Sequence, residues 1–324
     1  MTFKKLLLFF LIFASSKAAV AADLFDLQVL PLFASDSVRI NGTIVKSSHK
    51  TDTTSRRNNF SGLMNRWLAS ATVTISTGSN STILPVSDGD FSGTIPVESL
   101  ASFSISVFYQ QELLHQESLQ FRPQPDFLII SDIDDTILES EVSSKLNLVY
   151  NSLLIRYENR VAIKGTSKIY CSLNSASSTL GLPHFIYLSS SPSFLSRPIK
   201  RFLSVNQFPM GSVILKKSLF SGDHENHKTG WLEQITQIYP NTPLMLFGDS
   251  GEQDPEIYSN FASSLSKPGL IKAIFIRQIS DDKSRLQELA SIRLKMQKIN
   301  IPMRFWSSDE TLRSEIESLN LLMP

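Results

Sequence analysis

The pattern of apolar and polar positions changes its period near residue 125. Before that point, apolar or small residues alternate with polar ones in short runs at 38–44, 73–75, 91–97 and 103–109. Turn signals accompany these runs at Asn41-Gly42, 78–81 and 87–90. A period of two with polar turns predicts an antiparallel β domain, built as a small sandwich, over residues 22–124.

Beyond residue 125 the apolar positions form uninterrupted runs instead. These runs lie at 127–130, 185–188, 213–215, 244–247 and 274–276. Helical segments are predicted between and after them, at 195–205, 231–239, 256–265, 280–300 and 310–322. Buried strands that alternate with helices are typical of an α/β domain with a largely parallel sheet, here over residues 125–324. The prolines within 121–125 mark the linker between the two domains.

The first apolar run of this second half ends in a pair of carboxylates. Residues 132–136 read DIDDT, so Asp132 and Asp134 follow the strand directly. Ligands of open parallel sheets bind beyond the carboxyl ends of the strands, where Asp132 could attack phosphorus and hold a metal while Asp134 passes a proton. Thr136 would orient the turn. An acidic turn with local backbone hydrogen bonds is the alternative interpretation.

Three further polar segments follow in the order that a phosphoryl-transfer site requires. Ser189, Ser190 and Ser191 come after the second run and could bind phosphate oxygens. Lys228 precedes an amphipathic segment, where its ammonium could reach a phosphate near a helix start. Asp249 and Asp254 lie in a glycine-containing turn after the run at 244–247. Each segment alone also fits an ordinary turn or a solvated lysine.

These residues predict a magnesium site, because a dianionic phosphate approaches a carboxylate only if cations offset both charges. Magnesium is usually held by one or two carboxylates together with substrate oxygens. Asp132 and Asp249 suit that role, with Asp254 as a direct or water-bridged partner and the carbonyl of Asp134 as a further oxygen. The five histidines do not form the spaced set of a structural zinc site.

From Asp126 onward, DIDDT, the SSSP string, the His-Lys pair and GDSGEQDPEIY together resemble the catalytic domain of actin-patch-associated phosphatidate phosphatases, in the haloacid dehalogenase-like superfamily. The resemblance implies that Asp132 is the nucleophile that forms an aspartyl phosphate and that Asp134 is the general acid and then base. It implies phosphoryl contacts from Ser189 and Lys228.

The family's acids at the positions of Asp249 and Asp254 bind Mg²⁺, and its substrate is phosphatidate. This chain departs from the family's Ser-Asn-Ser-Pro-aromatic string, because Ser190 and Ser193 fill the Asn and aromatic positions. The resemblance therefore does not predict the shape of the substrate or the contacts with its headgroup. Two alternatives remain. The substrate could be another phosphomonoester, or the chain could be a non-catalytic lipid- or partner-binding protein on the same scaffold.

Composition and the N-terminal segment bear on location and partners. With 42% hydrophobic residues and a formal net charge of +1, the chain lacks the large basic field of a nucleic-acid binder. Lysines, an apolar run and small residues follow one another within 1–21, which is the order of a secretory signal peptide. Cys171 is the single cysteine, and export without disulfides favours a bacterial periplasm.

One segment of the first half could contact a membrane. Apolar residues at Phe60, Leu63, Met64, Trp67 and Leu68 form a helical stripe with arginines close by. A basic amphipathic helix could lie on a lipid surface and bring the enzyme to its substrate. A helix that packs against the β domain is the favoured alternative.

Overall fold

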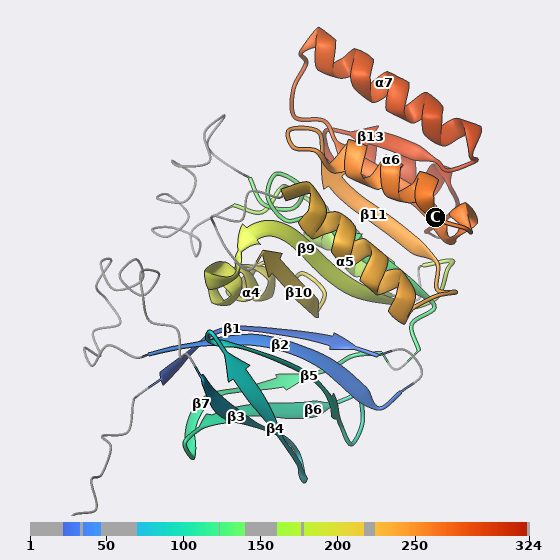
Figure 1. Cartoon of the computed structure of the whole chain (residues 1–324). Coiled ribbons are helices and arrows are strands. Elements are labelled where there is room, and N and C mark those ends of the chain that lie inside the picture. The colour runs from blue at the N-terminus through green and yellow to red at the C-terminus, as the bar shows by residue number, and fades with distance from the viewer. Residues whose placement is uncertain are drawn as a thin grey trace, which may run out of the picture.

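The computed structural model describes residues 22–32, 35–46, 70–122, 124–139, 161–175, 178–216 and 224–322. Two sheets lie one above the other, and the helices of the described residues accompany only the second (Figure 1). Among the described residues, none of the helices is long and apolar enough to cross a membrane.

The first sheet is antiparallel and has the strand order β1-β2-β5-β4-β3-β6-β7. Its strands are β1 (Ala22–Pro31), β2 (Ser37–Lys46), β3 (Ser70–Thr77), β4 (Asn80–Ser87), β5 (Asp90–Pro96), β6 (Phe103–Tyr109) and β7 (Glu112–Leu119). Only the pair Ser87↔Asp90 joins β4 to β5, so the sheet consists of two parts that share one apolar core. The predicted antiparallel β architecture is confirmed.

Period-two alternation correctly located four of these strands and missed β1, β4 and β7. In β6, buried residues alternate with half-buried ones, as the pattern predicts. The prediction of a turn at Asn41-Gly42 is wrong, because both residues lie inside β2 and pair with Ser92 and Phe91 of β5.

The second sheet is parallel throughout, with the strand order β10-β9-β8-β11-β12-β13. Its strands are β8 (Phe127–Ser131), β9 (Pro183–Pro192), β10 (Gly211–Lys216), β11 (Leu244–Asp249), β12 (Ile271–Arg277) and β13 (Met303–Trp306). All five predicted apolar runs lie in these strands, and β8 and β11 are buried along their whole length. The mixed α/β class is therefore confirmed.

Helices cover both faces of this sheet. They are α3 (Thr166–Leu173), α4 (Ser196–Val205), α5 (His224–Ile238), α6 (Asp254–Ser264), α7 (Lys283–Lys298) and α8 (Asp309–Ser318), with 3₁₀ turns at Ser193–Leu195 and Pro268–Leu270. α5, α6 and α7 pack on one face, and α3, α4 and α8 on the other. Ser308 caps the start of α8 as part of a capping box with Thr311.

Strand β1 carries the contact between the two sheets. Its Leu30 is buried in the same apolar core as α5 and α6. Gln28 Nε2 donates to Leu215 O at 3.1 Å, and Tyr239 Oη donates to Pro31 O at 2.6 Å. The first sheet ends at Leu119 and the second begins at Phe127. The predicted boundary at residues 124 and 125 falls between them, and the division into two domains stays a prediction.

Two predictions fall outside the described residues. They are the signal peptide at 1–21 and the amphipathic stripe at 60–68 with its membrane alternative.

Candidate active site

The ends of three neighbouring strands bring the predicted residues together. β9, β8 and β11 are adjacent and parallel, so their carboxyl ends lie at one edge of the sheet. Asp132 follows β8 directly, Ser189 lies in β9, and Asp249 is the last residue of β11. Acids that lie far apart in the sequence therefore meet at this edge, as ligands of parallel sheets do.

The turn after β8 fixes the position of Asp132. Asp135 adopts a left-handed backbone with φ 55°, which Asp tolerates better than most residues, and its N–H donates to Leu138 O at 2.8 Å. Thr136 Oγ1 donates to Asp132 Oδ2 at 3.3 Å. Arg277 Nη1 donates to Asp135 O at 3.0 Å, so β12 supports the turn from the far side. The turn therefore has the local hydrogen bonds of an acidic turn and also fixes the carboxylate of Asp132, the predicted nucleophile.

Lys228 lies inside the acidic cluster. Its side chain is 1% exposed, and its Nζ lies 2.9 Å from Asp132 Oδ1 and also pairs with Asp254 Oδ1. The sequence predicts Lys228 near a helix start, whereas α5 already begins at His224 and places it one turn inside. The ammonium is therefore held by the helix and by two carboxylates. The solvated-lysine alternative is wrong.

Asp249 and Asp254 complete a group of three buried acids with Asp132. One oxygen from each lies within 4.8 Å of the others. Asp249 Oδ1 accepts the N–H of Gly251 at 2.6 Å, whereas its Oδ2 is buried and has no hydrogen-bond partner. Gly248 leaves room for the group, because a Cβ there would lie 2.5 Å from Asp254 Oδ2. A carboxylate oxygen left unpaired among other acids is suited to a cation.

The electrostatics of the described cluster also call for a further cation. Burial raises the pKa of Asp132 well above its usual range; Lys228 opposes this shift, and Asp254 and Asp249 add to it. Burial and Asp254 likewise raise the pKa of Asp249. Burial alone would lower the pKa of Lys228, but Asp132 and Asp254 raise it well above its usual value. One ammonium faces three carboxylates, so a divalent cation would balance the charge.

Two serines of β9 contact the carboxylate of Asp134. Ser191 Oγ donates to Asp134 Oδ2 at 2.6 Å, and Ser189 Oγ lies 3.3 Å from the same oxygen. The N–H of Ser191 donates to Ser189 Oγ at 2.9 Å, which orients that hydroxyl. Ser190 is half-buried between them. Asp134 is thus tied to the predicted phosphate-binding strand, and its Oδ1 is buried without a hydrogen-bond partner.

Sequence reasoning missed two residues that support the site. Arg277 holds the turn at Asp135, and Tyr258 Oη donates to Phe247 O at 3.0 Å beneath the end of β11. Arg277 is the last residue of β12, at the same sheet edge as the acids. A polar residue at the end of a predicted parallel strand was the signal that could have found it.

Comparisons with known proteins match the second half of the chain to one family. Residues 127–278 match the family described as "Phosphatidate phosphatase APP1, catalytic domain". Phosphatidate phosphatase APP1 of Saccharomyces cerevisiae is 31% identical over 162 residues, which cover 48% of this chain and 26% of that protein. An uncharacterized protein of Schizosaccharomyces pombe is 30% identical over 161 residues, with 48% and 25% covered.

The predicted resemblance is therefore confirmed for the second half of the chain, although the match spans only about a quarter of the length of these curated relatives. Among solved structures, a glycosyl hydrolase family 2 member from Bacteroides cellulosilyticus covers 93% of this chain and 45% of its own. Its identity is 7% and its TM-score 0.28, which is too low to bear on the fold.

Proposed function

We propose that residues 125–324 form a haloacid dehalogenase-like phosphatase domain that hydrolyses phosphatidate to diacylglycerol and phosphate. The observation that carries the proposal is the buried pairing of Lys228 with Asp132 and Asp254 at the carboxyl ends of parallel strands. The match of residues 127–278 to a phosphatidate phosphatase catalytic domain supports the choice of substrate. A bound phosphate would meet a nucleophile, an acid and a cation within one site.

In the first step Asp132 attacks phosphorus. A bond forms between a carboxylate oxygen and phosphorus, and the bond from phosphorus to the substrate's alcohol oxygen breaks. Asp134 gives its proton to that oxygen as it leaves. The hydroxyls of Ser191 and Ser189 hold the Asp134 carboxyl in position. The Lys228 ammonium, already beside Asp132, offsets the negative charge that accumulates around phosphorus.

In the second step Asp134 acts as a base. It takes a proton from a water molecule, whose oxygen attacks phosphorus and releases free phosphate from Asp132. Asp132 is thereby regenerated as a carboxylate. The residues suited to hold Mg²⁺ are Asp132, Asp249 and Asp254, whose oxygens lie within 4.8 Å of one another, together with the carbonyl of Asp134. When bound, the ion would supply positive charge for the phosphate oxygens and for the buried carboxylates.

The test is phosphate release by the purified protein from phosphatidate in mixed micelles, with and without magnesium. Asp132→Asn is the test variant, and Asp36→Asn, at an exposed position away from the site, is its matched control. Release that needs magnesium and Asp132, and that Asp36→Asn leaves intact, would support the proposal. Release that persists after thorough chelation would refute the metal assignment.

A second set of reactions separates the alternatives. Release from p-nitrophenyl phosphate but not from phosphatidate would keep the chemistry and overturn the lipid substrate. No release from either compound by the folded wild-type protein would favour the non-catalytic binding protein. The buried lysine and acids argue against that outcome, because an unused site would have no reason to retain charged groups whose burial is unfavourable.

We also propose that the protein is exported, with cleavage after residue 21 and a periplasmic location. The proposal rests on the order of lysines, apolar run and small residues in the N-terminal segment. Cell fractionation followed by N-terminal sequencing tests it. A cytosolic protein that keeps Met1 would contradict it.

A further inference from the structure

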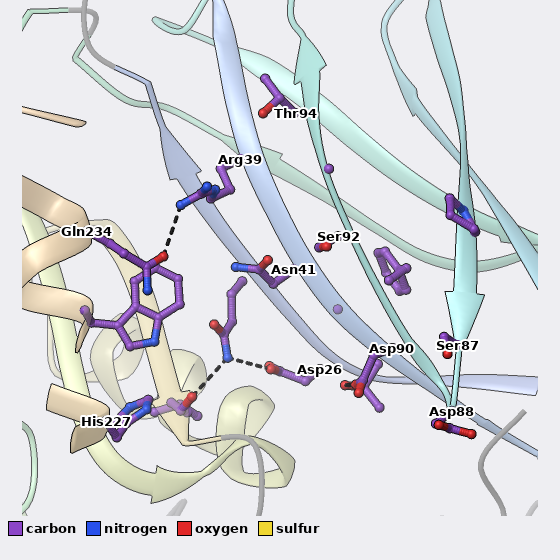
Figure 2. Close-up of a pocket in the computed structure, with 18 residues that line it drawn as sticks. Asp26, Arg39, Asn41, Ser87, Asp88, Asp90, Ser92, Thr94, His227 and Gln234 are labelled. Atoms are coloured by element: carbon purple, nitrogen blue, oxygen red, sulfur yellow. Dashed lines mark hydrogen bonds between the residues drawn. The ribbon is translucent and has the colours of Figure 1, made fainter. Parts of the chain in front are cut away.

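A polar cleft lies between the first sheet and helix α5, outside the group of acids described above. Its volume is about 910 Å³, within the range of small-molecule binding sites. Strands β1, β2 and β5 form its floor, and α5 forms one wall (Figure 2). Neither the proposed catalytic residues nor the phosphate-binding serines line it.

The floor consists of polar side chains in register on three neighbouring strands. The strand pairing places them in the rows Asp26–Thr43–Asp90, Gln28–Asn41–Ser92 and Leu30–Arg39–Thr94. Eight of these nine side chains are polar, and the strands lie roughly 4.8 Å apart. The alternate residues of β2, such as Val38 and Ile40, are fully buried in the apolar core of the first sheet.

A polar outer face is ordinary for an antiparallel sheet that faces water. This face is different, because a second layer covers part of it. Asp26 and Thr43 are 5% and 4% exposed, and Arg39 and Asn41 are half-buried. Polar groups withdrawn from water in this way are costly unless they find partners.

The wall from α5 presents His227, Trp231 and Gln234. Their spacing of i, i+4 and i+7 places them on one face of the helix. Arg39 Nη1 donates to Gln234 Oε1 at 3.1 Å across the cleft, and Gln28 Nε2 donates to Leu215 O at 3.1 Å at its inner end. These bonds join the floor of the cleft to α5 and to β10.

The interior of the cleft offers neutral hydrogen-bonding groups beside an aromatic surface. Figure 2 shows Arg39 and Asn41 extending from β2 toward Gln234. The Asn41 amide has no side-chain hydrogen bond to any described residue, so its two donors and its acceptor can serve a ligand. The half-buried indole of Trp231 adds a flat apolar surface.

The charges of the cleft select against anionic ligands. Three lining carboxylates outnumber the single guanidinium of Arg39, which disfavours phosphates and other anions. Two of those carboxylates are already engaged, since Asp26 Oδ2 accepts from Gln28 at 2.9 Å and Asp90 Oδ1 from Thr43 at 2.7 Å. These neutral donors leave the carboxylate charges in place, so a cationic compound is one of the comparison ligands in the test. A ligand with hydroxyl groups and a C–H face matches both the amides and the indole.

We propose that this cleft binds a neutral polyhydroxylated ligand of the size of a few sugar residues, at a site separate from the catalytic centre. Hydroxyl groups would pair with Asn41, Gln234 and the hydroxyls of β5, and one sugar face would pack on Trp231. The first domain would then be a binding module. The proposal does not depend on phosphatase activity.

The test is binding of the full-length protein to an array of immobilised neutral glycans, followed by calorimetry with the glycans that bind. Trp231→Ala should weaken binding about tenfold, the loss expected for a stacked aromatic contact. Asn41→Ala should weaken it about fivefold through lost hydrogen bonds. Glu233→Ala, an exposed position on another face of α5, is the control and should leave binding within about twofold.

Circular dichroism and thermal unfolding establish whether each variant is folded. If Trp231→Ala does not fold, Asn41→Ala provides the second test. Spermidine and a heparin-derived disaccharide are the cationic and anionic comparison ligands. Failure of every neutral glycan to bind would overturn the proposal. Binding that survives both substitutions, or a preference for either charged ligand, would do the same. No phosphatase substrate is present, so a failure of catalysis and a failure of this proposal are distinguishable.

Discussion

Replacing Lys228 by Met tests the charge balance of the acidic cluster directly. Met has a similar length and suits a buried position, so the change removes mainly the ammonium. Lys228 is 1% exposed and pairs with Asp132 and Asp254, which are 2% and 0% exposed. Removing one partner of a buried ion pair typically costs about 3–5 kcal/mol, because the other charge stays buried and uncompensated. We expect the free energy of unfolding to fall by about that amount in chelator.

Urea unfolding followed by tryptophan fluorescence measures this loss, since Trp231 and Trp306 lie in the layer of the second sheet. Lys272→Met is the matched control, because Lys272 is exposed on β12 and its replacement should change stability by less than about 0.5 kcal/mol. Saturating magnesium should reduce the loss in Lys228→Met by compensating the same carboxylates. If Lys228→Met unfolds like the wild-type protein in chelator, the three acids do not carry the charge that we assign to them.

Four further predictions follow from the described contacts. Asp132→Asn should lower phosphate release at least about 10³-fold while circular dichroism stays unchanged; activity close to wild type would exclude Asp132 as the nucleophile. Magnesium at 100 times its dissociation constant should stabilise the folded protein by about 2.7 kcal/mol in urea unfolding, and no shift would argue against a metal at the acids. Burial lowers the pKa of His184 from 6.5 to about 3. As the pH falls, His184 is therefore protonated in the unfolded chain before it is protonated in the folded protein. Stability should fall below pH 6.5, by up to about 1.4 kcal/mol per pH unit, and His184→Gln should remove that slope. Burial raises the pKa of Asp26 from 3.8 to about 6. The folded protein therefore binds this proton more tightly than the unfolded chain, and the stability gained from it is lost as the pH rises through that range. Asp26→Asn should be more stable above pH 6, by at most about 3 kcal/mol, and equal stability at pH 5 and pH 8 would contradict this.

The sequence predicted the acidic edge of the parallel sheet because Asp132 and Asp249 come just after apolar runs, whereas Asp254 follows five residues after Asp249, at the start of α6. Asp132 and Asp249 are placed by strands that are buried on both faces, and such strands are recognisable as uninterrupted apolar runs. Their closeness then follows from the adjacency of β8 and β11. The environment of Lys228 was not predictable in the same way. Four polar residues open α5 before it, and the apolar stripe of the helix becomes visible only from Trp231 onward.

Two of the three missed strands, β1 and β7, lack the alternation of one buried and one exposed face. β1 packs on two layers at once, with Leu27 and Val29 in one core and Leu30 in the other, so its apolar residues do not alternate. β7 lies at the edge of its sheet, and none of its residues is fully buried. Period-two patterns require one buried and one exposed face, and neither strand meets that condition.

Asn41-Gly42 shows how tertiary packing can produce a local turn signal inside a strand. Gly42 is required there because a Cβ would lie 2.2 Å from Cζ of the Phe91 ring, which crosses it from β5. Asn41 lies on the opposite face and extends into the cleft beside α5. Asn41 makes no side-chain hydrogen bond to a described residue, so it contributes little to the stability of the part of the fold that the structure describes. If Asn41 serves the ligand, as we propose, Asn41→Ala should weaken glycan binding more than it lowers stability.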